Sequence, residues 1–202
     1  TPKGRTISIS YQLGVPSIIM QSISSVRTCG MNKILIGCSE TAVAVFGVYS
    51  KLQSFIFMPI FGLNNGMIPI VAYNYGARSK KRIMETVWLS IGSAVGIMLI
   101  GLLVFHLTRP QLLMLFQADE EMLAIGVPAL RIISLSFLFA GYCIIVGSVF
   151  QALGNGVYSL IISVARQLVC ILPLAWFFAR TFGLHAVWLS LPLAEITSVV
   201  LS

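Results

Sequence analysis

Residues 62–82 read GLNNGMIPIVAYNYGARSKKR and follow directly on the apolar run FIFMPIF. The surrounding apolar segment, 42–76, would reach about 52 Å as a single helix, which is longer than the ~30 Å hydrocarbon core of a bilayer. Pro59 and Pro69 each remove a backbone donor, so we expect a kink between them, where Gly62 and Gly66 also weaken the helix. Irregular backbone at membrane depth survives only inside protein or beside a wet cavity, so this stretch is expected to face other helices.

The composition of the whole chain indicates a membrane protein. Of 202 residues, 57% are hydrophobic and 9% are charged, whereas soluble domains carry about 25% charged residues. So few charges cannot cover a soluble surface. The formal net charge of +7 has a simple explanation in a membrane protein, because Lys and Arg gather on the cytoplasmic flanks of spans. We therefore expect a lipid bilayer, and no nucleic acid, as partner.

Six segments are long and apolar enough to cross a bilayer as helices. They cover residues 9–36, 42–76, 84–107, 124–152, 157–180 and 184–202. The sequence predicts an all-α, polytopic membrane protein in which residues 1–202 form a single transmembrane lobe. The last segment stops inside an apolar run, which suggests a fragment of a longer protein. Lys and Arg are more numerous in the connections on the side of the N-terminus, which favours a cytoplasmic N-terminus.

Three stretches resemble one family of transporters. GVYSKLQSFIFMPIFGLNNGMIPIVAYNYGARSKKR, residues 47–82, resembles the signature of the multidrug and toxic compound extrusion (MATE) family, in which a helix with proline and spaced glycines leads to an Asn-Tyr-Gly-Ala turn. That turn is Asn74, Tyr75, Gly76 and Ala77, predicted to lie at the cytoplasmic face. Residues 150–178 and 183–195 look like the entries to the eleventh and twelfth helices of the family. Their order and spacing match a C-terminal six-helix lobe over nearly the whole chain.

The resemblance implies a twelve-helix transporter with two six-helix lobes around a central cavity, of which this chain lacks the N-terminal lobe. Such proteins export organic, often cationic, drugs or toxic compounds in exchange for protons or sodium ions across the plasma membrane, here expected to be a bacterial inner membrane. No cofactor, metal or catalytic constellation is expected, which argues against an enzyme. The alternative is a flippase for lipid-linked saccharide precursors, of related architecture, which would need several basic groups in its cavity to hold a pyrophosphate.

Ionisable side chains inside the spans are candidates for function, because each is costly to insert. Glu195 is the only carboxylate in the interior of a predicted span and is a candidate proton or cation site. The equally weighted alternative is an ion pair that serves assembly alone, with Arg166 or Lys51 as partner. Lys51, Arg166 and Arg27 are therefore candidates for ion pairing or coupling. Arg131 lies near a helix end, from which its side chain can reach the interface.

Aromatic and amide side chains are candidates for the substrate cavity. The faces of Tyr49, Phe55 and Tyr142 could hold a cationic drug, although most aromatic residues in such a chain simply pack or face lipid. Asn64 and Asn65 lie beside the expected kink and need hydrogen-bond partners, which more often are neighbouring helices than ligands.

Overall fold

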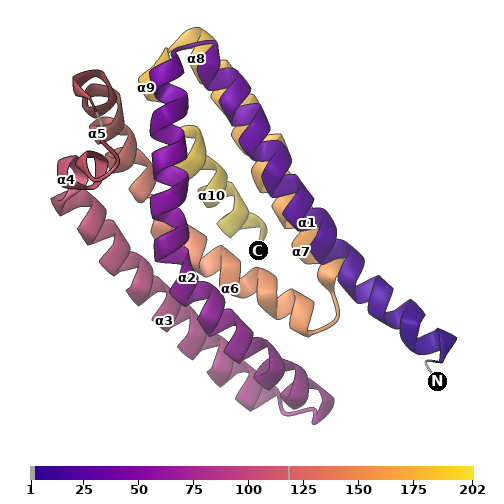
Figure 1. Ribbon diagram of the computed structural model, residues 1–202. Helices are drawn as coiled ribbons and strands as arrows, with labels where there is room; N and C mark the ends of the chain where they lie inside the picture. Colours follow the sequence, from indigo (N-terminus) through magenta and orange to yellow (C-terminus); the bar gives the residue numbers. More distant parts are fainter. Residues whose placement is uncertain (1–2, 118) are drawn as a thin grey trace.

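The computed structural model describes residues 3–117 and 119–202 and is helical nearly throughout. The elements are α1 Gly4–Ile36, α2 Glu40–Gly76, α3 Lys80–Leu107, α4 Arg109–Met114, α5 Glu120–Ser134, α6 Phe137–Ala152, α7 Gly156–Val164, the π-helix η1 Ala165–Ile171, α8 Leu172–Thr181, α9 Leu184–Val187 and α10 Ser190–Leu201. The all-α prediction is confirmed. Figure 1 shows long helices packed side by side, with α10 and the C-terminus in the middle of the view.

The apolar segments form helices close to the predicted bounds, but they differ in how well they suit a bilayer. Among the described residues, four helical stretches have the length and hydropathy to cross a membrane: 40–76, 80–107, 156–181 and 184–201. The pair α5 and α6, bent by 48° at a short break, can make a fifth. The 33-residue α1 has the length but is absent from this set. Its serines, two glutamines and two arginines lower its hydropathy, and four of these residues line the cavity described below.

The long helix α2 contains both prolines of the predicted kink. It runs unbroken over 37 residues, about 55 Å at helical rise, and Figure 1 shows it changing direction partway along. The Ser39 hydroxyl caps its start by accepting a hydrogen bond from the Thr41 N–H at 3.2 Å. At its end, Arg78 adopts a positive φ of 56° and the Ser79 N–H donates to the Asn74 carbonyl at 2.9 Å. This left-handed turn satisfies carbonyls that the last helical turn would leave unpaired.

Small residues allow the helices to approach closely at the core. A Cβ atom on Gly141 of α6 would lie 2.9 Å from Met98 and 3.4 Å from the Ala94 carbonyl of α3. A Cβ on Gly101 of α3 would lie 2.8 Å from Ile56 of α2. Helices in membranes associate largely through such close packing, because lipid is as apolar as the side chains themselves. The helix α3 is therefore held tightly between α2 and α6, which it contacts extensively.

The helices α7, η1 and α8 form one continuous rod whose centre is a π-helix. The seven π-helical residues end two positions before Pro173, which cannot donate a hydrogen bond to the preceding turn. Segments of π-helix are rare and often occur at functional sites. Here the segment contains Arg166 and Gln167. It packs against α10 and α1, and so it brings these two polar side chains to the interior of the lobe.

Candidate functional site

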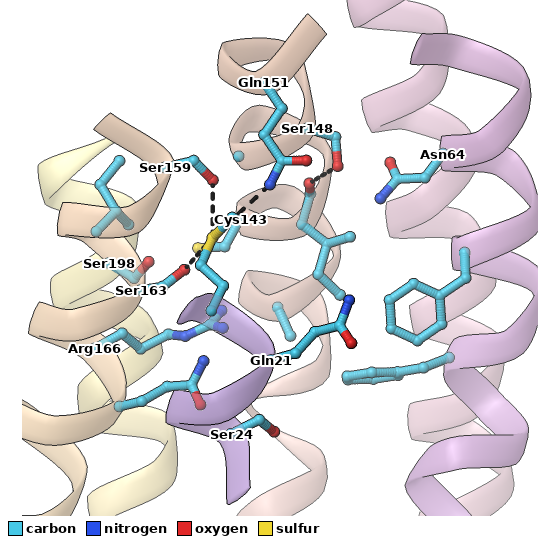
Figure 2. Close-up of a pocket in the computed structure, with 18 of the residues that line it drawn as sticks. Gln21, Ser24, Asn64, Cys143, Ser148, Gln151, Ser159, Ser163, Arg166 and Ser198 are labelled. Carbon is cyan, nitrogen blue, oxygen red and sulfur yellow. Dashed lines mark hydrogen bonds between the residues drawn. The ribbon is translucent and has the colours of Figure 1, made fainter. Parts of the chain in front are cut away.

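A cavity of about 810 Å³ lies between the two halves of the helix bundle. Its wall is made by side chains of α1, α2, α6, α7, η1 and α10. Figure 2 shows Ser159, Ser163 and Arg166 along one side of the cavity and Asn64 of α2 on the other, with Ser148 and Gln151 of α6 between them. Cavities of about 300–1,000 Å³ are typical of sites for small organic molecules.

One face of α1 supplies a polar stripe to the cavity. Its lining residues fall at the spacing of one helical face: Ser17, Met20, Gln21, Ser24 and Arg27. The exposed positions between them include Ile18, Ile19 and Val26, which suit lipid or another apolar surface. The polar side of α1 is thus turned toward the cavity, which explains why this helix is less apolar than the others.

The Met20 sulfur accepts three hydrogen bonds across the junction of α1 with α6 and α7. The hydroxyls of Ser163 and Ser159 donate at 3.4 Å and 3.5 Å, and the Gln151 amide donates at 3.8 Å. In Figure 2 the dashed lines from Ser159, Ser163 and Gln151 are these three bonds, and they converge beside the Cys143 label. A thioether sulfur is a weak acceptor, so each of these three hydrogen bonds to Met20 is weak.

A half-buried ion pair joins η1 to α10 at the cavity. Arg166 Nη1 lies 3.5 Å from Glu195 Oε2, and the two side chains are 18% and 13% exposed. The Cys143 thiol of α6 lies 4.0 Å from the backbone carbonyl of Glu195, so a third helix also meets α10 here. The structure thus brings together two of the residues that the sequence singled out.

Arg27 also lines the cavity, but it is not part of an ion pair. The ion pairs found in the described chain are Lys81–Glu85 and Arg166–Glu195. The Arg27 Nε atom is buried and has no hydrogen-bond partner among the described residues. A smaller hollow of about 10 Å³ is lined by both Arg27 and Glu195, together with Tyr49, Gln53 and Ser136. Arg27 and Glu195 therefore share this small space as well as the main cavity.

The α2 side of the cavity is mixed in character. Phe57, Met58 and Phe61 supply apolar and aromatic surface, and Asn64, Asn65, Gln53 and Ser54 supply polar groups. Asn64 is buried, and its Oδ1 atom has no partner in the described chain. Part of the segment between Pro59 and Pro69 therefore lines the cavity, through Phe61, Asn64 and Asn65.

Several candidates lie elsewhere. Lys51 is exposed, stands 5.8 Å from the centre of the Phe116 ring and is not among the residues that line the cavity. Phe55 is 69% exposed and Tyr142 is half-buried, and neither lines the cavity. Tyr49 is buried and borders only the small hollow, where it packs against Phe46.

The Asn-Tyr-Gly-Ala turn contributes nothing to the cavity. Asn74 is buried and donates to the Ile70 carbonyl at 2.8 Å, while Tyr75, Gly76 and Ala77 are exposed at the end of α2. Arg131 is also exposed and lies outside the cavity lining. The turn is a structural terminus of the helix.

Sequence reasoning missed most of the polar lining. Gln21, Ser24, Ser148, Ser163 and Gln167 all face the cavity, yet none carries a charge that would single it out. The available signal was periodicity. Polar residues at 17, 21, 24 and 27 recur on one face of an otherwise apolar helix, a pattern that indicates a wet interior face.

Comparison with known proteins places this architecture in a family. The sequence profile of the MatE family matches residues 16–177. The multidrug export protein MepA of Staphylococcus haemolyticus is 27% identical over 192 residues, which are 95% of this chain and 42% of that protein. The same protein of Staphylococcus aureus strain MSSA476 is 26% identical, over 96% of this chain and 43% of its own. The chain thus spans less than half the length of these relatives.

Solved structures show the same fold. A transporter of the MOP superfamily from Pyrococcus furiosus superposes with a TM-score of 0.93 at 24% identity, covering 99% of this chain and 46% of that one. A multidrug resistance MATE family transporter in an outward-facing conformation gives 0.92 at 23% identity, over the same shares. Several helices of the described chain can span a membrane, and the helix order matches one lobe of these larger proteins. With the profile covering most of its length, the chain belongs to the MatE family.

Proposed function

We propose that this chain is one lobe of a secondary active exporter in a bacterial plasma membrane. In this proposal the lobe binds small organic compounds in its cavity and works with a second six-helix lobe, as the relatives' greater length suggests. The observation that carries the proposal is the 810 Å³ cavity, which combines aromatic surface with hydrogen-bonding groups and a half-buried ion pair. Such a lining suits drug-sized molecules, and the similar Staphylococcus proteins are multidrug export proteins. The chain acts as a transporter rather than an enzyme.

The coupling ion is proposed to act at Glu195. This is the only carboxylate among the residues that line the cavity in the described chain. A proton or sodium ion bound there would compete with Arg166 for the carboxylate and loosen the contact between η1 and α10. Such a change at a helix interface is the kind of local event that can bias the rocking of two lobes in alternating access.

The flippase alternative is less well supported. It would be favoured if Arg27, Lys51 and Arg166 converged on one cavity, and Lys51 lies outside it. Two guanidinium groups beside a carboxylate make a weaker site for a pyrophosphate than a ring of basic groups. The Staphylococcus proteins named above are multidrug export proteins.

Dye efflux from cells tests the proposal. The complete protein that contains this lobe is expressed in a drug-sensitive bacterium, and ethidium efflux is followed with a proton uncoupler and then in sodium-free buffer. We expect efflux that one of the two treatments abolishes. Absence of efflux at normal expression would contradict the exporter function.

The coupling step needs its own variant. Glu195→Gln is expected to lose ethidium-driven proton or sodium exchange while the protein still reaches the membrane. Glu85→Gln, at an exposed site on α3, is the matched control and should exchange normally. If Glu195→Gln exchanges as well as this control, Glu195 is not the coupling site.

A further inference from the structure

The cavity carries an excess of positive charge. The charged residues that line it in the described chain are Arg27, Arg166 and Glu195, which are two guanidinium groups and one carboxylate. Glu195 is already engaged by Arg166 at 3.5 Å. Arg27 is therefore the cavity cation for which the described lining supplies no counter-charge of its own.

Apart from Glu195, which is already paired with Arg166, the polar groups around Arg27 are neutral. In the small hollow it meets Tyr49, Gln53 and Ser136, and in the main cavity its own helix adds Ser24 and Gln21 one turn and two turns earlier. Hydroxyl and amide groups can donate to an anion but cannot neutralise a guanidinium. A charge away from water is costly unless it is paired, and Arg does not give up its proton. The site is therefore satisfied best when a bound molecule brings an acidic group.

We propose that Arg27 is the docking point for a carboxylate on the transported compound, so that this lobe favours aromatic compounds with a free carboxylate over their esters. The inference rests on the proposed use of the cavity as a substrate site. A guanidinium and a carboxylate can form two parallel hydrogen bonds, which fixes orientation as well as adding affinity. The aromatic body of the same molecule would lie against Phe57, Met58 and Phe61 on the α2 wall.

Glu195 gives the site a second selectivity. A carboxylate at Arg27 shares the small hollow with Glu195, which repels it, whereas a cationic compound is attracted by Glu195 and repelled by Arg27. Arg27 is thus expected to raise the affinity of the cavity for acids, and Glu195 to raise its affinity for cations.

A pair of dyes that differ only in the acidic group tests this. Rhodamine B has a free carboxylate on a cationic aromatic body, and its methyl ester has the same body without the negative charge. Binding of each dye to the purified complete protein is measured by fluorescence polarisation. Arg27→Gln is expected to weaken rhodamine B binding about tenfold, the usual effect of one charge-assisted contact, and not to weaken binding of the cationic ester, because Arg27 repels the ester.

Three further variants sharpen the result. Arg27→Lys keeps the charge but loses the two-pronged geometry, so its affinity for rhodamine B should fall between those of the wild type and Arg27→Gln. Glu195→Gln should strengthen rhodamine B binding relative to the ester. Arg131→Gln removes an exposed arginine outside the cavity and should leave both affinities unchanged.

Two results would overturn the inference. One is an Arg27→Gln protein that binds rhodamine B as the wild type does. The other is an Arg27→Gln protein that loses affinity for both dyes equally. If Arg27→Gln fails to fold and binds neither dye, Arg27→Lys decides: the inference is overturned when Arg27→Lys does not prefer rhodamine B to its ester. The proposed export function fails separately, through absence of efflux of the ester from cells, because the binding assay requires no transport.

Discussion

Arg166 Nη1 lies 3.5 Å from Glu195 Oε2 and joins the π-helical segment η1 to the last helix, α10. Both side chains are largely shielded, so each depends on the other for neutralisation. The pair connects two segments that contact one another directly, at a wall of the cavity. It is therefore a structural link and, in our proposal, the place where the coupling ion acts.

The two halves of this ion pair should not be equivalent in stability. Glu195→Gln leaves a half-buried Arg166 that cannot lose its charge, whereas Arg166→Gln leaves a carboxylate that can take up a proton. We expect Glu195→Gln to cost at most about 3 kcal/mol, the low end of the range for breaking a buried pair because this pair is half-buried, and Arg166→Gln to cost less. Thermal unfolding of the purified protein in detergent measures both.

The double variant and an exposed pair serve as controls for that experiment. Arg166→Gln combined with Glu195→Gln should recover most of the loss, because no uncompensated charge remains. Lys81 and Glu85, 3.9 Å apart with side chains 88% and 64% exposed, should tolerate the same treatment with little change. Equal losses in the two single variants would argue that packing, not charge, holds this contact.

The glycine at the α3–α6 contact should resist enlargement. Gly141→Leu places a side chain where even a Cβ would lie 2.9 Å from Met98 and 3.4 Å from backbone, so the helices must separate. Overpacking of this kind typically costs about 1–3 kcal/mol. Gly92→Leu, on the facing helix α3 and with nothing within 4 Å of its Cβ position, should leave the unfolding temperature nearly unchanged. A variant at 141 as stable as the one at 92 would show that α3 and α6 are less closely packed.

The shared acceptor at Met20 should matter more than its apolar volume. Met20→Leu keeps the size but removes the partner of the Ser159, Ser163 and Gln151 donors, and Ser159 is buried. We expect a loss of about 1 kcal/mol, at the low end for unsatisfied donors because a thioether is a weak acceptor. Met58→Leu, which lines the same cavity from an exposed position, is the control. Identical unfolding temperatures for the two variants would show that the sulfur contacts add nothing.

The start of α5 should depend on its capping carboxylate. Asp119 Oδ1 accepts from the Met122 N–H at 2.8 Å, which satisfies one of the free donors of the first turn. Asp119→Ala should lower the free energy of unfolding by about 1 kcal/mol, and Asp119→Asn by much less, since Asn also caps well. Thermal unfolding distinguishes the two, and a larger loss for the asparagine variant would contradict a capping role.

Much of the fold could be predicted because it depends on local composition. Apolar length predicts helices whose bounds mostly lie within a few residues of those observed, and α2 ends at Gly76, within the Asn-Tyr-Gly-Ala sequence. The π-helical segment and the 48° bend between α5 and α6 were not anticipated, because both depend on how neighbouring helices meet. The spacing of polar residues in α1 predicts its polar stripe, but the serines carry no charge and were not among the candidate residues.

The site could be predicted only in part. Charge inside a span identifies Arg27, Arg166 and Glu195 without a structure, because such groups are rare and costly. The same argument selected Lys51, which lies at Phe116, since sequence alone does not say which face of α2 turns inward. Aromatic residues are too common in an apolar chain to choose among, and the cavity uses Phe57 and Phe61 rather than Phe55 or Tyr142.

The sulfur of Met20 has a consequence for how tolerant this wall can be. Three donors that meet a weak acceptor lose little when they turn to another oxygen, and an unbranched thioether side chain moves aside easily. In the proposed exporter, a carbonyl or ether oxygen of a bound compound would replace the weak sulfur acceptor with a stronger one, and no donor would be left without a partner. In that exporter, a surface whose internal hydrogen bonds exchange at little cost in free energy would accept compounds of many shapes.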